Sequence, residues 1–134
     1  MFHFPPTAKR VQMHTSACSN RKIQVQTVQH TRELETADAK RLKTRLDRLD
    51  REWDTERVLE TNASIIILSG LLLGRKNRKW LLLPLGVSAF LLQHALQGWC
   101  PPLPVIRALG VRTPQEIESE RADVLSILRQ HKAP

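Results

Sequence analysis

Two apolar stretches dominate the pattern of hydrophobic and polar positions. They cover residues 58–74 and 80–96, and the five residues between them include four Lys or Arg. A 17-residue α-helix measures ~25 Å, just short of the ~30 Å hydrocarbon core of a bilayer. The first stretch has no charged residue after Glu60, and the second has none. The pattern predicts a short two-helix transmembrane hairpin over residues 58–98.

A soluble helical hairpin with a basic binding surface is the alternative, because helices buried in a protein core are also apolar all round. We favour the membrane, since a chain of 134 residues with three Phe, three Trp and no Tyr offers little other apolar surface to cover two such helices. Trp80 and Trp99 bracket the second stretch and are predicted to be interfacial anchors.

Small residues suggest how the two helices pack. Gly70 and Gly74 form a GxxxG pattern, which lets helix backbones approach closely in lipid, although Gly74 could equally end its helix. In the second stretch Gly86 and Ser88 offer a matching small surface, and Pro84 predicts a kink. We therefore expect Gly70, Gly74, Gly86 and Ser88 to pack the hairpin.

The N-terminal part divides in two. Residues 1–35 are expected to form a disordered tail, because the alternating residues 23–27 would be a strand without a partner. Residues 36–57 predict a basic amphipathic helix that begins at a Thr36 cap and carries Leu42 and Leu49 on its apolar stripe. This helix could form a short coiled coil, lie on an anionic membrane surface, or pack on the C-terminal segment.

Residues 99–134 predict an interfacial segment followed by a helix. Three prolines end the second apolar helix, and a short helix over residues 104–109 would place Val105, Ile106 and Leu109 on the membrane interface. Thr113, followed by Pro and then by Glu at the third helical position, predicts the start of a further amphipathic helix. The expected fold is therefore an all-α membrane protein, with its hairpin flanked by amphipathic helices.

The charge pattern bears on partners and orientation. The net charge of +8 suits anionic lipid headgroups, whereas nucleic-acid binding is disfavoured because no stacking aromatics are interleaved with the basic residues and no zinc-ligand spacing is present. Near the spans, nine Lys or Arg on the side of the termini compete with four in the loop. The count predicts both termini in the cytoplasm, although the dense charge of the loop favours the opposite orientation. No cleavable signal precedes the hairpin.

Cys100 is the one residue that suggests chemistry. On a continuous helix His94 would point about 240° away from it, so we expect no shared face and a packing role for the thiol. No catalytic, cofactor or metal-binding pattern is evident, and the chain is not expected to be an enzyme. We favour a membrane anchor that dimerises or recruits a membrane partner; a thiol-dependent accessory of sulfur or redox chemistry acting through Cys100 is the alternative.

The chain also resembles a known family, the YgaP-like inner-membrane proteins. The resemblance covers residues 51–117 and rests on residues 51–54, 56–57, 62–64, 90–104, Arg107, 109–113 and 116–117. It implies a hairpin in the bacterial inner membrane with cytoplasmic termini, in a family whose members are sometimes fused to a rhodanese sulfurtransferase domain and can make dimer contacts. The N-terminal half here is too short for a rhodanese domain and has no such cysteine loop, so sulfurtransferase activity is not expected.

Overall fold

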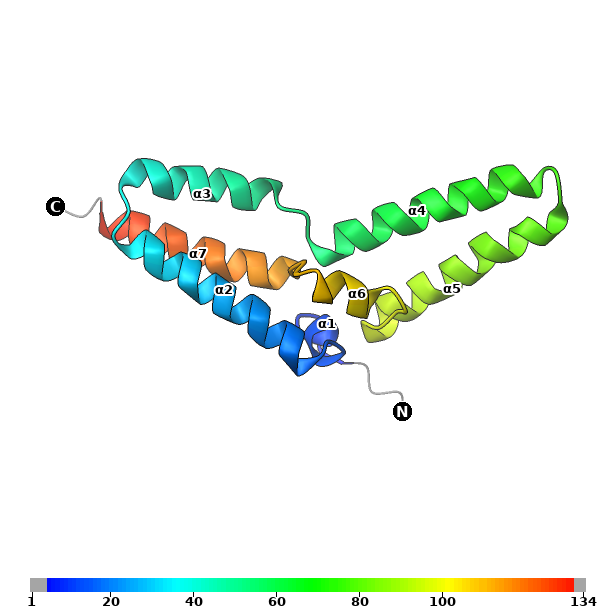
Figure 1. Cartoon of the computed structure of the whole chain (residues 1–134), viewed down its shortest axis with the longest axis horizontal. Helices are drawn as coiled ribbons and strands as arrows, with labels where there is room; N and C mark the ends of the chain where they lie inside the picture. Colours follow the sequence, from blue (N-terminus) through cyan, green and yellow to red (C-terminus); the bar gives the residue numbers. More distant parts are fainter. Residues whose placement is uncertain (1–4, 132–134) are drawn as a thin grey trace.

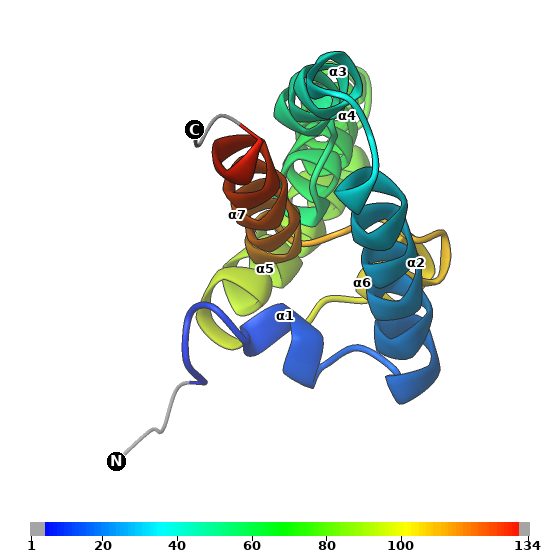
Figure 2. The same ribbon diagram turned by 90° about the vertical axis from the view of Figure 1, so that its left-hand side faces the viewer.

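The computed structural model describes residues 5–131, and every regular element in this range is a helix (Figure 1). In chain order the helices are α1 Arg10–Met13, α2 Ala17–Glu35, α3 Ala39–Arg51, α4 Thr55–Gly74, the 3₁₀ turn η1 Arg78–Leu81, α5 Leu82–Gln97, α6 Leu103–Ala108 and α7 Pro114–Gln130. Helices α2, α3 and α7 form one lobe, seen end-on in Figure 2. Helices α4 and α5 form an arm that extends away from it, and α1 and α6 lie at the junction (Figure 1).

The N-terminal region differs from our expectation. Residues 1–4 lie outside the described residues, but most of residues 5–35 forms α1 and α2 rather than a disordered tail. Ser16 caps α2 by accepting a hydrogen bond from the amide of Ser19, and Ile23 is buried. Tertiary contacts also hold α2 in place: Asn20 donates a hydrogen bond to the carbonyl of Gln12 and accepts one from the distant Arg107.

Helix α3 packs against α7, which is one of the three placements that the sequence left open. Leu42 and Leu49 on its apolar stripe are buried, as is Val124 of α7. The start of α3 needs a correction: Asp38, not Thr36, accepts the capping hydrogen bond, from the amide of Arg41. Thr36 instead directly follows α2, a helix that the pattern did not indicate.

The hairpin forms where the sequence places it. Asp54 caps α4 by accepting a hydrogen bond from the amide of Arg57. Gly70 meets Pro84 so closely that a Cβ atom would lie 2.6 Å from the proline Cδ, and Gly74 lies equally close to Leu81. These two glycines therefore allow α4 to contact the η1–α5 segment.

Two details of α5 differ from expectation. A Cβ on Gly86 would meet no atom within 4 Å, and Ser88 is exposed, so neither packs against α4. Pro84 is the third residue of α5, in the first helical turn, where backbone amides have no intrahelical acceptor. The proline therefore lies in the first turn of α5, directly after the 3₁₀ turn η1.

Helix α6 begins one residue before the expected start and presents two unlike faces. Leu103, Ile106 and Arg107 are buried, whereas Val105 and Leu109 are 62% and 78% exposed. Ile106 was expected at the interface but packs inward, because it lies on the same side of the helix as the buried Leu103 and Arg107. Gly110 follows with a φ of 87°, the left-handed conformation that glycine adopts readily.

Candidate functional site

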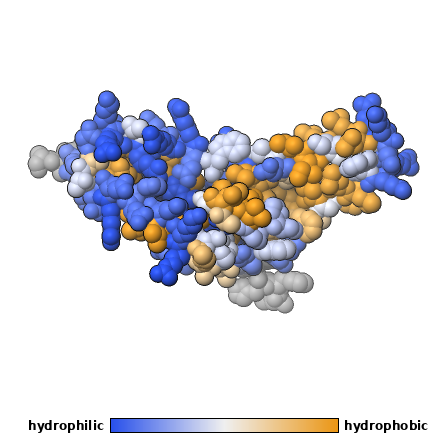
Figure 3. Space-filling model, viewed as in Figure 1, coloured by the Kyte–Doolittle hydropathy of each residue, from blue (hydrophilic) through white to orange (hydrophobic). Residues whose placement is uncertain are grey.

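The most prominent surface feature is the apolar surface of the hairpin. Figure 3 shows it as a hydrophobic region between a hydrophilic lobe and a hydrophilic tip. In the apolar windows within residues 39–74 and 78–97, just 17% and 11% of the residues are buried. The exposed large side chains are Ile65, Ile66, Leu68, Leu71, Leu72 and Leu73 on α4, and Leu82, Leu83, Leu85, Phe90, Leu92 and Leu96 on α5. Both helices are long and apolar enough to cross a membrane.

Charged and aromatic side chains lie at the two ends of this surface. The tip between α4 and α5 holds four exposed cations, and the half-exposed Trp80 follows them. At the other end Trp99 is partly buried. The guanidinium carbon of Arg57 lies over the ring of Trp53, 4.6 Å from the centroid of that ring. The apolar surface is thus bounded at both ends by groups that prefer a membrane–water interface.

A polar cluster joins three helices at the base of the hairpin. Glu56 of α4 accepts a hydrogen bond of 3.2 Å from the Nη2 of Arg10, and its other carboxylate oxygen lies 3.2 Å from the Nε2 of His94 on α5. His94 is 2% exposed. Gly98, which ends α5 with a φ of 78°, allows the backbone of Arg10 to pack directly on it. The N-terminal segment is therefore fastened to the hairpin.

Cys100 lies beside this cluster, which corrects our expectation that it would share no face with His94. Helix α5 ends at Gln97, and Gly98 after it is in the left-handed conformation, so helical geometry no longer relates the two residues. The thiol lies close to the imidazole of His94, and the Nδ1 of His94 has no hydrogen-bond partner among the described residues. Cys100 itself is 1% exposed, whereas Cys18 is exposed.

An apolar groove of about 520 Å³ adjoins the same place. Its walls come from α4, α5, α6 and the turn before α6, and they include Leu59, Ala63, Val87, Phe90, Cys100 and Val105. Almost every lining side chain is apolar. The groove is continuous with the exposed apolar surface, because Ile66 and Phe90 belong to both.

A buried arginine forms a junction between the N- and C-terminal parts of the chain. Arg107 donates two hydrogen bonds to Glu116, and it also bonds Thr15, Asn20 and the carbonyl of Val111. Burial raises the pKa of Glu116, but the hydrogen bonds from Arg107 and from the amide of Thr113 more than offset this, so the pKa lies below its ordinary value of 4.5.

A second arginine binds the helical lobe to the start of the hairpin. Arg112 donates to both carboxylate oxygens of Glu52 and to the buried Glu120, which also accepts a bond of 2.7 Å from Arg45. Burial opposes the charge of Arg112, but the bonds to Glu52 and Glu120 outweigh it and raise the pKa of the guanidinium. We did not foresee either arginine cluster. No local spacing signals them, because Arg107 lies in α6 and Arg112 in the loop before α7, whereas their partners Glu116 and Glu120 lie in α7.

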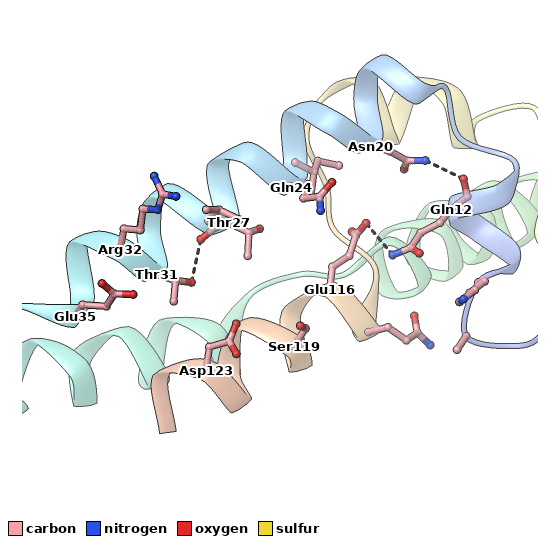
Figure 4. A pocket seen from close by; sticks show the side chains of 15 residues that line it. Gln12, Asn20, Gln24, Thr27, Thr31, Arg32, Glu35, Glu116, Ser119 and Asp123 are labelled. Atoms are coloured by element: carbon pink, nitrogen blue, oxygen red, sulfur yellow. Dashed lines mark hydrogen bonds between the residues drawn. The ribbon is translucent and has the colours of Figure 1, made fainter. Parts of the chain in front are cut away.

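A polar groove of about 680 Å³ lies between α1, α2 and α7 (Figure 4). Gln12 donates to Glu116 across it, and Asn20 donates to the carbonyl of Gln12. These polar groups therefore bond one another. Among the described residues, no group of three side chains is arranged to hold a metal ion.

Comparisons with protein-family models, with curated proteins and with solved structures find no match for the chain.

Proposed function

We propose that the chain is a membrane-anchored interaction protein. In this proposal α4 and α5 cross the bilayer as a hairpin, and the lobe of α2, α3 and α7 stays in the cytoplasm with both termini. The observation that supports it is the continuous exposed apolar surface of α4 and α5, bounded by charges at both ends. Leaving such a surface in water would invite aggregation, whereas each Leu, Ile, Phe or Val near a bilayer centre contributes about −0.3 to −0.6 kcal/mol to insertion.

The base of the hairpin supports the same placement. The exposed Val105 and Leu109 of α6, together with Trp53 and Trp99, form an apolar and aromatic rim next to the lobe. Such a rim suits the headgroup region of a membrane. Arg48 and Arg51 face solvent in the last turn of α3, the end of that helix nearest the hairpin (Figure 1), and would then attract anionic lipid.

The ion pairs refine the argument on orientation. Of the nine cations near the spans on the side of the termini, Arg45, Arg107 and Arg112 are paired with carboxylates. The four cations at the tip are in no ion pair within residues 5–131. The remaining count is six against four, which still favours cytoplasmic termini by the positive-inside rule. The resemblance to YgaP-like proteins favours the bacterial inner membrane and a homodimer as the assembled form.

Thiol labelling tests insertion and orientation together. Two single-cysteine proteins are compared in a Cys100→Ser background: one keeps Cys18 and the other combines Cys18→Ser with Lys76→Cys at the tip. We expect both to stay in the membrane pellet through a carbonate wash. A membrane-impermeant maleimide should label Lys76→Cys in spheroplasts with intact inner membranes and label Cys18 after permeabilisation. The reverse pattern would invert the orientation, and release by carbonate would contradict the membrane proposal.

A further inference from the structure

Cations without counter-charges lie close together at the tip of the hairpin. The turn between α4 and α5 contains Arg75, Lys76, Arg78 and Lys79. All of these side chains are exposed, and they form the hydrophilic tip in Figure 3. None takes part in an ion pair within residues 5–131, and the sequence has no Asp or Glu between Glu60 and Glu116. Their counter-charge must therefore come from outside the hairpin.

The backbone of this turn is held by its own hydrogen bonds. The amides of Lys76 and Asn77 both donate to the carbonyl of Leu73. The side-chain oxygen of Asn77 accepts a hydrogen bond of 3.0 Å from the amide of Lys79, and its carbonyl accepts one from the amide of Trp80. The cations are thus displayed on a compact turn rather than on a loose loop, so less conformational freedom is lost when they bind a partner.

The length of the hairpin sets the depth of the tip in a membrane. Helix α4, Thr55–Gly74, measures ~30 Å and α5, Leu82–Gln97, measures ~24 Å, against a hydrocarbon core of ~30 Å. Once Trp53 and Trp99 at the base lie in one headgroup region, the tip reaches the opposite headgroup region and not the water beyond it. The tip cations therefore lie at the level of the lipid phosphates.

We propose that the tip is a binding surface for the phosphate groups of anionic lipids in the leaflet opposite the lobe. This inference rests on the proposed function, because the tip meets that leaflet only if α4 and α5 cross the bilayer. Arg75 and Arg78 bind phosphate through paired hydrogen bonds, whereas Lys76 and Lys79 act as point charges. Trp80, which is half-exposed directly after the cations, prefers the same interface.

The depth of the tip favours a lipid over other anions. Lipid phosphates are concentrated at this level of the membrane, whereas a soluble anion would have to leave water to reach it. Each Lys or Arg near an anionic membrane surface strengthens binding by a factor of about five. Together the tip cations should therefore select anionic lipids over zwitterionic lipids, whose phosphate is neutralised by an attached cation.

The test measures which lipid lies beside Trp80. The full-length protein with Trp53→Phe and Trp99→Phe is placed in phosphatidylcholine vesicles, so that Trp80 alone fluoresces. Phosphatidylglycerol brominated near the top of its acyl chains is added, with brominated phosphatidylcholine as the reference, because bromine quenches a tryptophan that it contacts. We expect phosphatidylglycerol to be enriched at least about threefold beside Trp80. Equal quenching by the two lipids would overturn the inference.

Variants assign the preference to the tip. The tip variant combines Arg75→Gln, Lys76→Gln, Arg78→Gln and Lys79→Gln, and it should lose the enrichment. The matched control replaces exposed cations of α3 with Lys40→Gln, Lys43→Gln, Arg48→Gln and Arg51→Gln, and it should keep the enrichment. Enrichment that survives in the tip variant, or that disappears equally in the α3 variant, would contradict binding by the tip.

A salt comparison distinguishes lipid phosphate from free phosphate. Sodium phosphate and sodium chloride of equal ionic strength should weaken the enrichment to the same extent, through screening. Loss of the enrichment in phosphate alone would make the tip a site for free phosphate and would refute the assignment to lipid.

The inference and the proposed function can fail separately. If both brominated lipids quench Trp80 alike and the protein resists a carbonate wash, the hairpin is inserted and this inference alone fails. If neither lipid quenches Trp80 and carbonate releases the protein, the membrane proposal fails.

Discussion

Arg107 holds Glu116 through two parallel hydrogen bonds of 2.7 and 2.8 Å, and its side chain is completely excluded from solvent. Five hydrogen bonds reach acceptors in α7, in the segment before it, and in the N-terminal residues Thr15 and Asn20. Removing the guanidinium would leave a partly buried carboxylate without its counter-charge. The junction between the lobe and the hairpin therefore depends on this residue.

The first prediction follows from that burial. Arg107→Ala should destabilise the lobe by about 3–5 kcal/mol, the cost of removing one partner of a buried ion pair. The measurement is urea unfolding in detergent, followed by helical circular dichroism. Arg121→Ala is the matched control, because Arg121 pairs with Asp50 on the surface, and it should cost less than about 1 kcal/mol. Equal losses in the two variants would contradict the assigned role of Arg107.

The second prediction concerns pH. Because the folded state lowers the pKa of Glu116 below 4.5, its ionised form contributes stability above pH 4.5, and this contribution is lost as the pH falls through the lowered pKa. The midpoint of urea unfolding should therefore decrease below pH 4.5. Glu116→Gln should be less stable at neutral pH and should show a shallower decrease in acid. A parallel pH dependence in wild type and Glu116→Gln would exclude this linkage.

The third prediction concerns the turn after α5. Gly98 has a φ of 78°, and a Cβ would lie 2.7 Å from the backbone and side chain of Arg10. Gly98→Ala should therefore cost at least about 1–2 kcal/mol from backbone conformation alone, and it should loosen α1. Limited proteolysis near residues 5–16 reports the loosening. Gly86→Ala, in open space within α5, is the control and should leave the protein as stable as wild type or slightly more stable. Protection of α1 in Gly98→Ala would count against this packing.

The fourth prediction concerns the hairpin contact. Gly70→Val should force α4 away from Pro84, because a Cβ alone would already lie 2.6 Å from the proline Cδ. Spin labels at Ser69 and Leu85, two exposed positions, should report a longer or broader distance distribution. Gly86→Val serves as the control. An unchanged distance distribution in Gly70→Val would show that the close approach of Gly70 to Pro84 is not required to hold α4 beside α5.

Structural features that depend on residues close together in the sequence could be predicted from the sequence. The cap at Thr113, its capping box with Glu116 and the end of the first apolar helix at Gly74 agree with the structure. Each depends on residues a few positions apart, so a local pattern contains the necessary information. The expected cap at Thr36 was wrong because α3 begins at Ala39, after a cap at Asp38.

By itself, then, the sequence determined the all-helical character and the two apolar helices with their charged ends, because hydrophobic periodicity and capping act over one or two turns. The tertiary structure alone decided that residues 10–35 fold, that Arg107 pairs with Asn20 across 87 positions, and that Cys100 meets His94. These relationships arise when chain reversals bring distant segments together, and burial then selects which charges pair. No local pattern specifies such partners, since their stabilising energy appears only after the chain has folded.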